Sequence, residues 1–72
     1  MAPGVVAELD DNVSHARVWT MTKDGGVDQI VDTLYKHDIV MILARVPGFF
    51  YNAIVITVES AGLVSTARLR SL

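Results

Sequence analysis

Apolar and polar residues follow three patterns along the chain, and each pattern predicts a different element. Residues 15–23 alternate between two sides and are rich in β-branched and aromatic side chains, which predicts a β-strand. Residues 27–36 place apolar side chains three and four positions apart, the spacing typical of an amphipathic helix. Residues 39–58 hold a single charge and break at Pro47-Gly48, which predicts two strands buried on both faces.

Turn residues set the expected boundary between the first strand and the helix. Asp24-Gly25-Gly26 is typical of a turn, and Asp24 is a suitable N-cap for the helix that we expect next. Asp28 and Asp32 would then lie in its first turns, where the helix dipole favours negative charge.

The second half of the chain predicts a hairpin and a short tail. We place its strands at residues 39–46 and 53–59 and its loop at residues 47–52. Residues 63–72 alternate weakly and fit a short strand or a short helix. The element order is therefore β–α–β–β, an α+β fold over residues 14–72, preceded by a flexible N-terminal arm over residues 1–13.

This arrangement predicts a homo-oligomer. One helix covers one face of a small sheet, and nothing else in the chain would cover the other face. The chain has 72 residues, 51% of them hydrophobic, and no cysteine, so disulfides cannot stabilise so small a domain. We therefore expect a second copy of the chain to complete the sheet.

Charge and composition restrict the function classes. The net charge is −2, with −4 over residues 1–38 and +2 over residues 39–72, and no basic cluster suits nucleic acid. Arg45 and Pro47 argue against a membrane span through the apolar run, and no pattern resembles a secretion signal, so we expect a cytoplasmic protein. No catalytic motif, metal-ligand spacing or cofactor motif is present, and we expect no enzyme activity.

Aromatic and aliphatic residues are the candidate interface. Phe49-Phe50-Tyr51 lies in the loop between two apolar strands, either buried at a subunit contact or displayed to a partner. We expect the interface to comprise Trp19, Phe49, Phe50, Tyr51, Ile54 and Ile56.

The segment from residue 15 to residue 62 resembles the ACT domain, a small regulatory fold. The matching segments are HARVWTMTK, DGGVDQIVDTLYKHDIVMILARV and NAIVITVES. Gly25 and Val40 stand where that family usually has Pro and often has Asn. A weaker likeness links the same order, with VPGF at residues 46–49, to the PII signalling proteins. Both resemblances imply a ferredoxin-like sheet. The ACT likeness also implies an amino-acid or other small effector bound at Asp24, Gly25, Gly26, Val27 and Ile39.

These observations give three expectations for function. The first is a non-enzymatic regulatory or ligand-sensing module that self-associates through its sheet. The second is a small phage-type or accessory binding protein that inhibits or adapts a larger protein partner, marked by an exposed Phe49-Phe50-Tyr51 patch beside an acidic helix face. The third is a structural assembly protein, because residues 30–69 resemble the helix–strand–strand–helix shell protein of gas vesicles.

Overall fold

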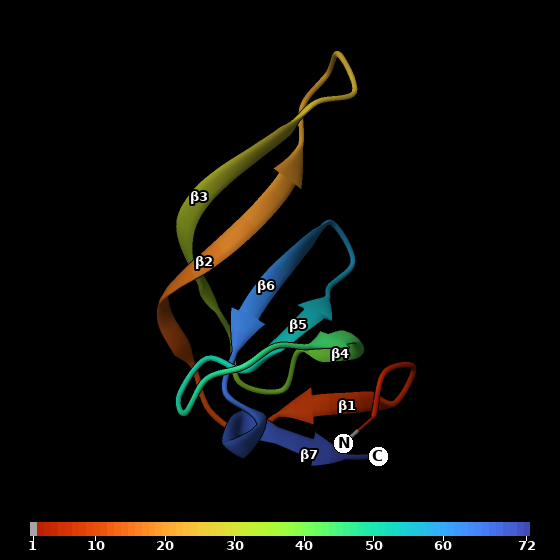
Figure 1. Cartoon of the computed structure of the whole chain (residues 1–72), viewed down its shortest axis with the longest axis vertical. Helices are drawn as coiled ribbons and strands as arrows, with labels where there is room; N and C mark the ends of the chain where they lie inside the picture. Colours follow the sequence, from red (N-terminus) through yellow and green to blue (C-terminus); the bar gives the residue numbers. More distant parts are fainter. Residues whose placement is uncertain (1) are drawn as a thin grey trace.

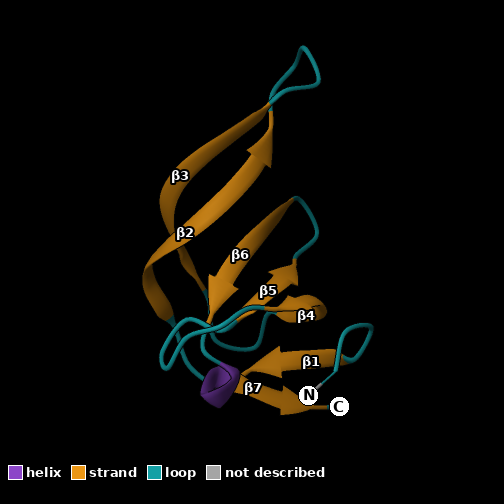
Figure 2. Cartoon of the chain, in the orientation of Figure 1, coloured by secondary structure: helices purple, strands orange, loops and turns teal. Residues whose placement is uncertain are grey.

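The computed structural model describes residues 2–72 and folds them into one antiparallel sheet of seven strands (Figure 1). Figure 2 shows one short helical turn, η1, and no α-helix among these residues. The elements are β1 (Val6–Leu9), β2 (Val13–Met21), β3 (Val27–Leu34), β4 (Ile39–Arg45), β5 (Ala53–Ile56), β6 (Ser60–Val64), η1 (Thr66–Arg68) and β7 (Leu69–Ser71).

The strand order across the sheet is β3-β2-β6-β5-β4-β1-β7. Figure 1 shows β1 and β7 running across the direction of β2, β3 and β6, so the sheet bends strongly along its width. Backbone hydrogen bonds continue the pairing of β1 with β4 into the β3–β4 turn: the Leu9 amide donates to the Asp38 carbonyl at 3.0 Å, and the His37 amide donates to the Leu9 carbonyl at 2.8 Å. The bend lets a single sheet enclose its own core.

The core lies on the concave face of this bent sheet. One row of paired positions crosses five strands and runs Ile30, Val18, Gly62, Val55, Ile42. Val18, Val55 and Ile42 are buried, whereas Ile30 extends past the core on β3. The buried apolar residues are Ala7, Leu9, Val13, Ala16, Val18, Leu34, Val40, Ile42, Ala53, Val55, Val64 and Leu69.

The helix expected over residues 27–36 is wrong. Those residues form β3, which pairs with β2 over nearly its whole length. Of the apolar residues that fitted a helical stripe, only Leu34 is buried. Three of the four, Val27, Ile30 and Val31, are β-branched and favour a strand, and the Asp-Gly-Gly sequence favours a hairpin turn. Pairing with the alternating strand β2 therefore decided the conformation.

The resemblance to ACT and PII proteins is wrong for the same reason. A ferredoxin-like fold needs a helix between two parallel strands, but every pair of neighbouring strands among residues 2–72 is antiparallel. The α+β class and the ferredoxin-like and ACT-like descriptions give way to an all-β fold. The helix–strand–strand–helix order behind the gas-vesicle likeness is likewise absent from the described residues.

The N-terminal arm is also corrected. Residues 6–9, expected in a loose segment, form β1 between β4 and β7, and the side chains of Ala7 and Leu9 are completely buried. The boundary placed between residues 13 and 14 falls inside the start of β2. The chain is one unit from β1 to β7.

The hairpin of the second half is confirmed, with shorter strands than expected, but the expected burial on both faces is wrong for β4, because Ile39, Met41 and Leu43 are exposed. β4 and β5 pair antiparallel, as the two apolar runs predicted. β6 was not expected, because Ala61 and Gly62 read as the end of a strand rather than the middle of one. The tail contains both elements that it allowed, the turn η1 and the short strand β7.

The reason given for a homo-oligomer does not survive this fold. That reason was a small sheet with one face covered by a helix and the other face uncovered. In the structure the sheet bends, and its strands enclose the buried apolar residues between them. A regulatory role at a subunit interface loses its structural basis with it. No helix in the described part of the chain is long and apolar enough to cross a membrane.

Candidate functional site

The loop between β4 and β5, residues 46–52, displays three aromatic side chains and is called the aromatic loop below. Phe49 is 94% exposed, Phe50 76% and Tyr51 54%. Gly48 has a φ of +154°, and a Cβ at this position would lie 2.8 Å from the Tyr51 carbonyl oxygen. Only glycine allows the chain to turn so tightly here, which brings the rings out to the surface.

Hydrogen bonds hold the base of the aromatic loop. The Val46 amide donates to the Asn52 carbonyl at 3.0 Å, and the Asn52 amide donates to the Val64 carbonyl at 3.0 Å. The side-chain oxygen of Asn52 accepts a 2.9 Å hydrogen bond from the Thr66 amide at the start of η1. Asn52 therefore ties the aromatic loop to both β6 and η1, and the rings stand on a fixed base.

A surface groove of about 400 Å³ lies beside these rings. It brings together the aromatic loop, the start of β2 and η1, which are far apart in the sequence. A smaller hollow of about 230 Å³ adjoins it through the shared residue Tyr51 and is lined by His15, Arg17, Tyr51 and Leu63. We call the larger hollow the aromatic groove; its lining residues are Asn12, Val13, Ser14, Phe50, Tyr51, Ser65, Ala67 and Arg68.

Local backbone features shape the other two walls of the aromatic groove. In β2 a bulge sets Ser14 and His15 against the single residue Thr33 of β3, and His15 takes a left-handed φ of 56°. At η1 the Ser65 hydroxyl accepts a hydrogen bond from the Ala67 amide at 3.2 Å and caps the turn. The Ser65 cap thereby fixes the η1 wall, and the bulge sets the course of the β2 wall.

Arg68 supplies positive charge to the aromatic groove. Its Nε lies 3.6 Å from Asp10 Oδ1, and its Nη1 lies 3.8 Å from Asp11 Oδ2. The two carboxylates limit the motion of the guanidinium, which stays partly exposed. Aromatic side chains and arginine are the types enriched in protein interfaces, and the groove offers both within one hollow.

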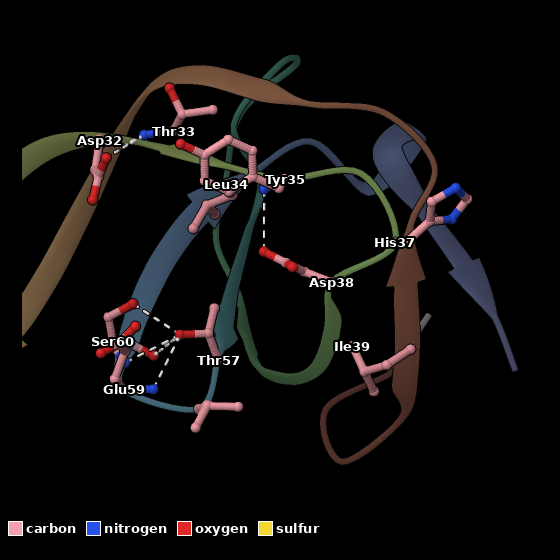
Figure 3. Close-up of a pocket in the computed structure, with 11 residues that line it drawn as sticks. Asp32, Thr33, Leu34, Tyr35, His37, Asp38, Ile39, Thr57, Glu59 and Ser60 are labelled. Carbon is pink, nitrogen blue, oxygen red and sulfur yellow. Dashed lines mark hydrogen bonds between the residues drawn. The ribbon is translucent and has the colours of Figure 1, made fainter.

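A second hollow, of about 450 Å³, lies between the end of β3, the start of β4 and the β5–β6 turn (Figure 3). Asp32, Asp38 and Glu59 make it acidic. Figure 3 shows its polar groups bonded within their own turns: Asp38 Oδ2 accepts from the Tyr35 amide at 3.1 Å, and Thr57 Oγ1 lies 2.9 Å from Ser60 Oγ. These bonds stabilise turns and do not pair a nucleophile with a base.

A third hollow, of about 460 Å³, is mainly apolar and lies on the outer face of the sheet. Trp19 and Met21 of β2, Val27 of β3, Leu43 of β4 and Ile56 of β5 line it with the β5–β6 turn. Among the residues that the structure describes, no group of three or more His, Cys, Asp and Glu side chains could hold a metal ion.

The five residues expected to bind an effector do not form one pocket. Asp24, Gly25 and Gly26 form the tip of the β2–β3 hairpin, Val27 lines the apolar hollow, and Ile39 lines the acidic hollow. Asp24 Oδ1 accepts hydrogen bonds from the Thr22 hydroxyl and from the Gly26 amide, which lies at 3.2 Å. The Thr22 bond, then the Gly26 bond, lower the pKa of Asp24 below its usual value.

The expected interface residues divide between two surfaces. Phe50 and Tyr51 line the aromatic groove, and Phe49 projects from the same loop. Trp19 and Ile56 line the apolar hollow, while Ile54 is half-buried on β5. The sequence did not reveal the opposite walls of the aromatic groove, Asn12, Ser14, Ser65 and Arg68, because only the fold brings them beside the aromatic loop.

Comparisons with protein-family models, with curated proteins and with solved structures find no match for this chain. The geometry of its surfaces is therefore the basis for the function proposed below.

Proposed function

We propose that the chain is a non-enzymatic binding module that attaches to a larger protein through the aromatic groove. The observation that supports this proposal most is the exposure of Phe50 and Tyr51 on a loop whose base is held by hydrogen bonds. Burying one such ring against a partner contributes about 1.5–3 kcal/mol. A soluble domain gains nothing from displaying rings in water, so a partner is the simplest reason for their position.

The fixed base of the loop strengthens the proposal. Binding costs about 0.5–1.5 kcal/mol for each side chain that must be immobilised. Asn52 fixes the loop, and Asp10 and Asp11 restrain Arg68 before a partner arrives. The groove is thus organised in advance, and more of the contact energy remains as affinity.

The partner side of the interface follows from the lining. The rings can pack against an apolar or aromatic side chain, while Arg68 and the Ser14 and Ser65 hydroxyls can donate hydrogen bonds to carboxylate or carbonyl oxygens. We therefore propose a partner segment that combines a large apolar side chain with an acidic one. The acidic helix face expected beside the rings is absent, since residues 27–34 form β3, and the charged side chain that lines the groove is Arg68.

A displayed library of random peptides tests the proposal. Peptides selected on the intact chain should bind Phe50→Ala and Tyr51→Ala at least tenfold more weakly, since each loss of about 1.4 kcal/mol is tenfold. Val58→Ala is the matched control, because Val58 is a fully exposed apolar residue on the β5–β6 turn outside the aromatic groove. Equal affinity of all three variants for the selected peptides would contradict the proposal.

Light scattering on the same proteins distinguishes a foreign partner from a second copy. We expect the mass of a single chain for the wild type and for Phe50→Ala. A dimer that Phe50→Ala dissociates would show that the rings bind another copy, and the proposed partner would be wrong.

The absence of cysteine supports the cytoplasm as the site of action, which stays a prediction.

A further inference from the structure

β3 forms one edge of the sheet and is paired on one side only. It is hydrogen-bonded to β2, and no other described strand lies beside it. Figure 1 shows no strand on the outer side of its upper part, next to the hairpin tip. At eight residues it is far longer than β7, the three-residue strand at the opposite edge. Long edge strands are templates for pairing with another chain unless their sequence prevents it.

The register identifies which backbone groups of β3 point away from the sheet. The Thr22 amide donates to the Gly26 carbonyl, so Thr22 and Gly26 form a hydrogen-bonded pair. Hydrogen-bonded pairs alternate with non-hydrogen-bonded pairs along an antiparallel ladder, so the backbone groups of Asp28 and Ile30 bond to β2. The backbone groups of the alternate residues point away from β2. The outward amides and carbonyls belong to Val27, Gln29 and Val31.

The first part of β3, residues 27–31, is available for pairing with another strand, whereas its end at Thr33 is not. Natural edges are blocked by charged side chains, proline or a bulge, and residues 27–31 contain no lysine, no proline and no bulge. Their one charge is Asp28, which disfavours a second copy of this edge and favours a basic strand. At Thr33 the outward amide already donates to Asp32 Oδ1 at 2.8 Å, which ends the open stretch. Val27, Ile30 and Val31 are exposed along it, at 64%, 41% and 67%.

The side chains beside this edge define the charge of an incoming strand. Asp28, Ile30 and Asp32 share one face of β3, and the residues opposite Asp28 and Asp32 on β2 are Thr20 and Ala16. These cross-strand neighbours bring no positive charge to the two carboxylates. An added strand would supply this positive charge if it carried basic residues opposite both aspartates, and an apolar residue would fit opposite Ile30.

We infer that β3 is a docking edge for an extended segment of another protein, with the pattern basic, any residue, apolar, any residue, basic. The added strand would bond to the backbone of Val27, Gln29 and Val31 and place its basic side chains beside Asp28 and Asp32. This surface is separate from the aromatic groove and goes beyond the function proposed above. A second copy of the chain fits it poorly, because like-charged aspartates would lie close together across the new pair.

A capped peptide, Lys-Val-Ile-Thr-Lys-Val, tests the inference on the intact chain. In an antiparallel pair its lysines lie opposite Asp32 and Asp28, and its isoleucine lies opposite Ile30. Amide hydrogen exchange should slow at Val27, Gln29 and Val31 when the peptide binds, and should change little at Asp28 and Ile30, which already bond to β2. Slowing at the inward residues instead, or no binding at millimolar peptide, would overturn the inference.

Charge exchange tests the partner chemistry. The double variant D28K/D32K should bind the lysine peptide about tenfold more weakly, and should bind the matching Glu-Val-Ile-Thr-Glu-Val peptide more tightly than the wild type does. The loss of two cross-strand charge pairs and the new repulsion between like charges together give that factor. If the wild type binds both peptides equally, the charge assignment is wrong.

A backbone variant separates edge pairing from surface attraction. The Gln29 amide points outward, so Gln29→Pro removes a donor for the new strand without breaking the β2 ladder. It should abolish peptide binding, while Gln29→Thr should retain it, with both variants folded by circular dichroism. Phe50→Ala should leave the lysine peptide unaffected, and if binding fell with Phe50→Ala instead, the site would be the aromatic groove and the inference would fail.

Discussion

Gly62→Ala is expected to destabilise the fold through one contact between β6 and the end of β3. A Cβ at residue 62 would lie 2.7 Å from Leu34 Cδ1, 3.7 Å from its Cγ and 3.8 Å from its Cδ2. Carbon atoms in good contact are about 3.5–4.0 Å apart, so the Leu34 side chain must move by about 1 Å. Leu34 is buried among core residues and has little room for that movement.

The magnitude follows from two opposing effects. Overpacking a well-filled core costs about 1–3 kcal/mol. Replacing glycine by alanine stabilises by about 0.4–1 kcal/mol, because the unfolded chain loses conformational freedom. The net loss of unfolding free energy should be about 1–2 kcal/mol, which lowers the melting temperature by roughly 4–8 °C for each kcal/mol in a domain of this size.

The effect of Gly62→Ala should change sign when Leu34 is also replaced, and this change tests the contact. Leu34→Ala alone should cost about 2–5 kcal/mol. In that background the contact is gone, and Gly62→Ala should stabilise the protein by about 0.4–1 kcal/mol. Urea unfolding of the four proteins, followed by Trp19 fluorescence, measures both numbers. The same effect of Gly62→Ala in both backgrounds would show that Leu34 does not lie over Gly62.

Two further predictions concern β1 and the hairpin tip. Leu9→Ala should lower the unfolding free energy by about 2–5 kcal/mol in a urea titration, because Leu9 is completely buried in β1; a change below about 0.5 kcal/mol would restore the N-terminal arm. The pKa of Asp24 is lowered in the folded chain, so its ionised carboxylate stabilises the turn fully at pH values above 3.8, the ordinary pKa of an aspartate. This stabilisation is lost as the pH falls through the lower pKa of the folded state. The Gly26 amide resonance should therefore titrate with a midpoint below 3.8, and Asp24→Asn should remove the titration; a midpoint at or above 3.8 would contradict the turn geometry.

The parts of the fold that could be predicted are those with a strong local signal. The nearly continuous apolar runs identified β4 and β5 and their antiparallel pairing. β1 has no such signal, since it is four residues long and only its pairing with β4 and β7 makes it a strand. Gly62 looked like a strand end, but its missing side chain makes room for Leu34.

β3 shows why hydrophobic spacing misled the prediction. Val27, Ile30, Val31 and Leu34 fit a helical period. However, only five residues separate the end of β2 from the start of β3, and β2 supplies a long alternating partner. That information is non-local, and the local spacing could not contain it. The aromatic loop was identified as a possible interface, whereas Ser14, Ser65 and Arg68 reach it only through the fold.

The pairing of β2 with β3 is the central claim, because it replaces the helix and creates the exposed edge. Two-dimensional NMR tests it directly through the contact between the Hα atoms of Trp19 and Gln29, which face each other in a pair without hydrogen bonds, where the backbones come closest. The account predicts strong Hα–Hα cross-peaks for Trp19 with Gln29 and for Arg17 with Val31. Contacts between residues three positions apart within 27–34, without those cross-peaks, would show a helix and contradict the account.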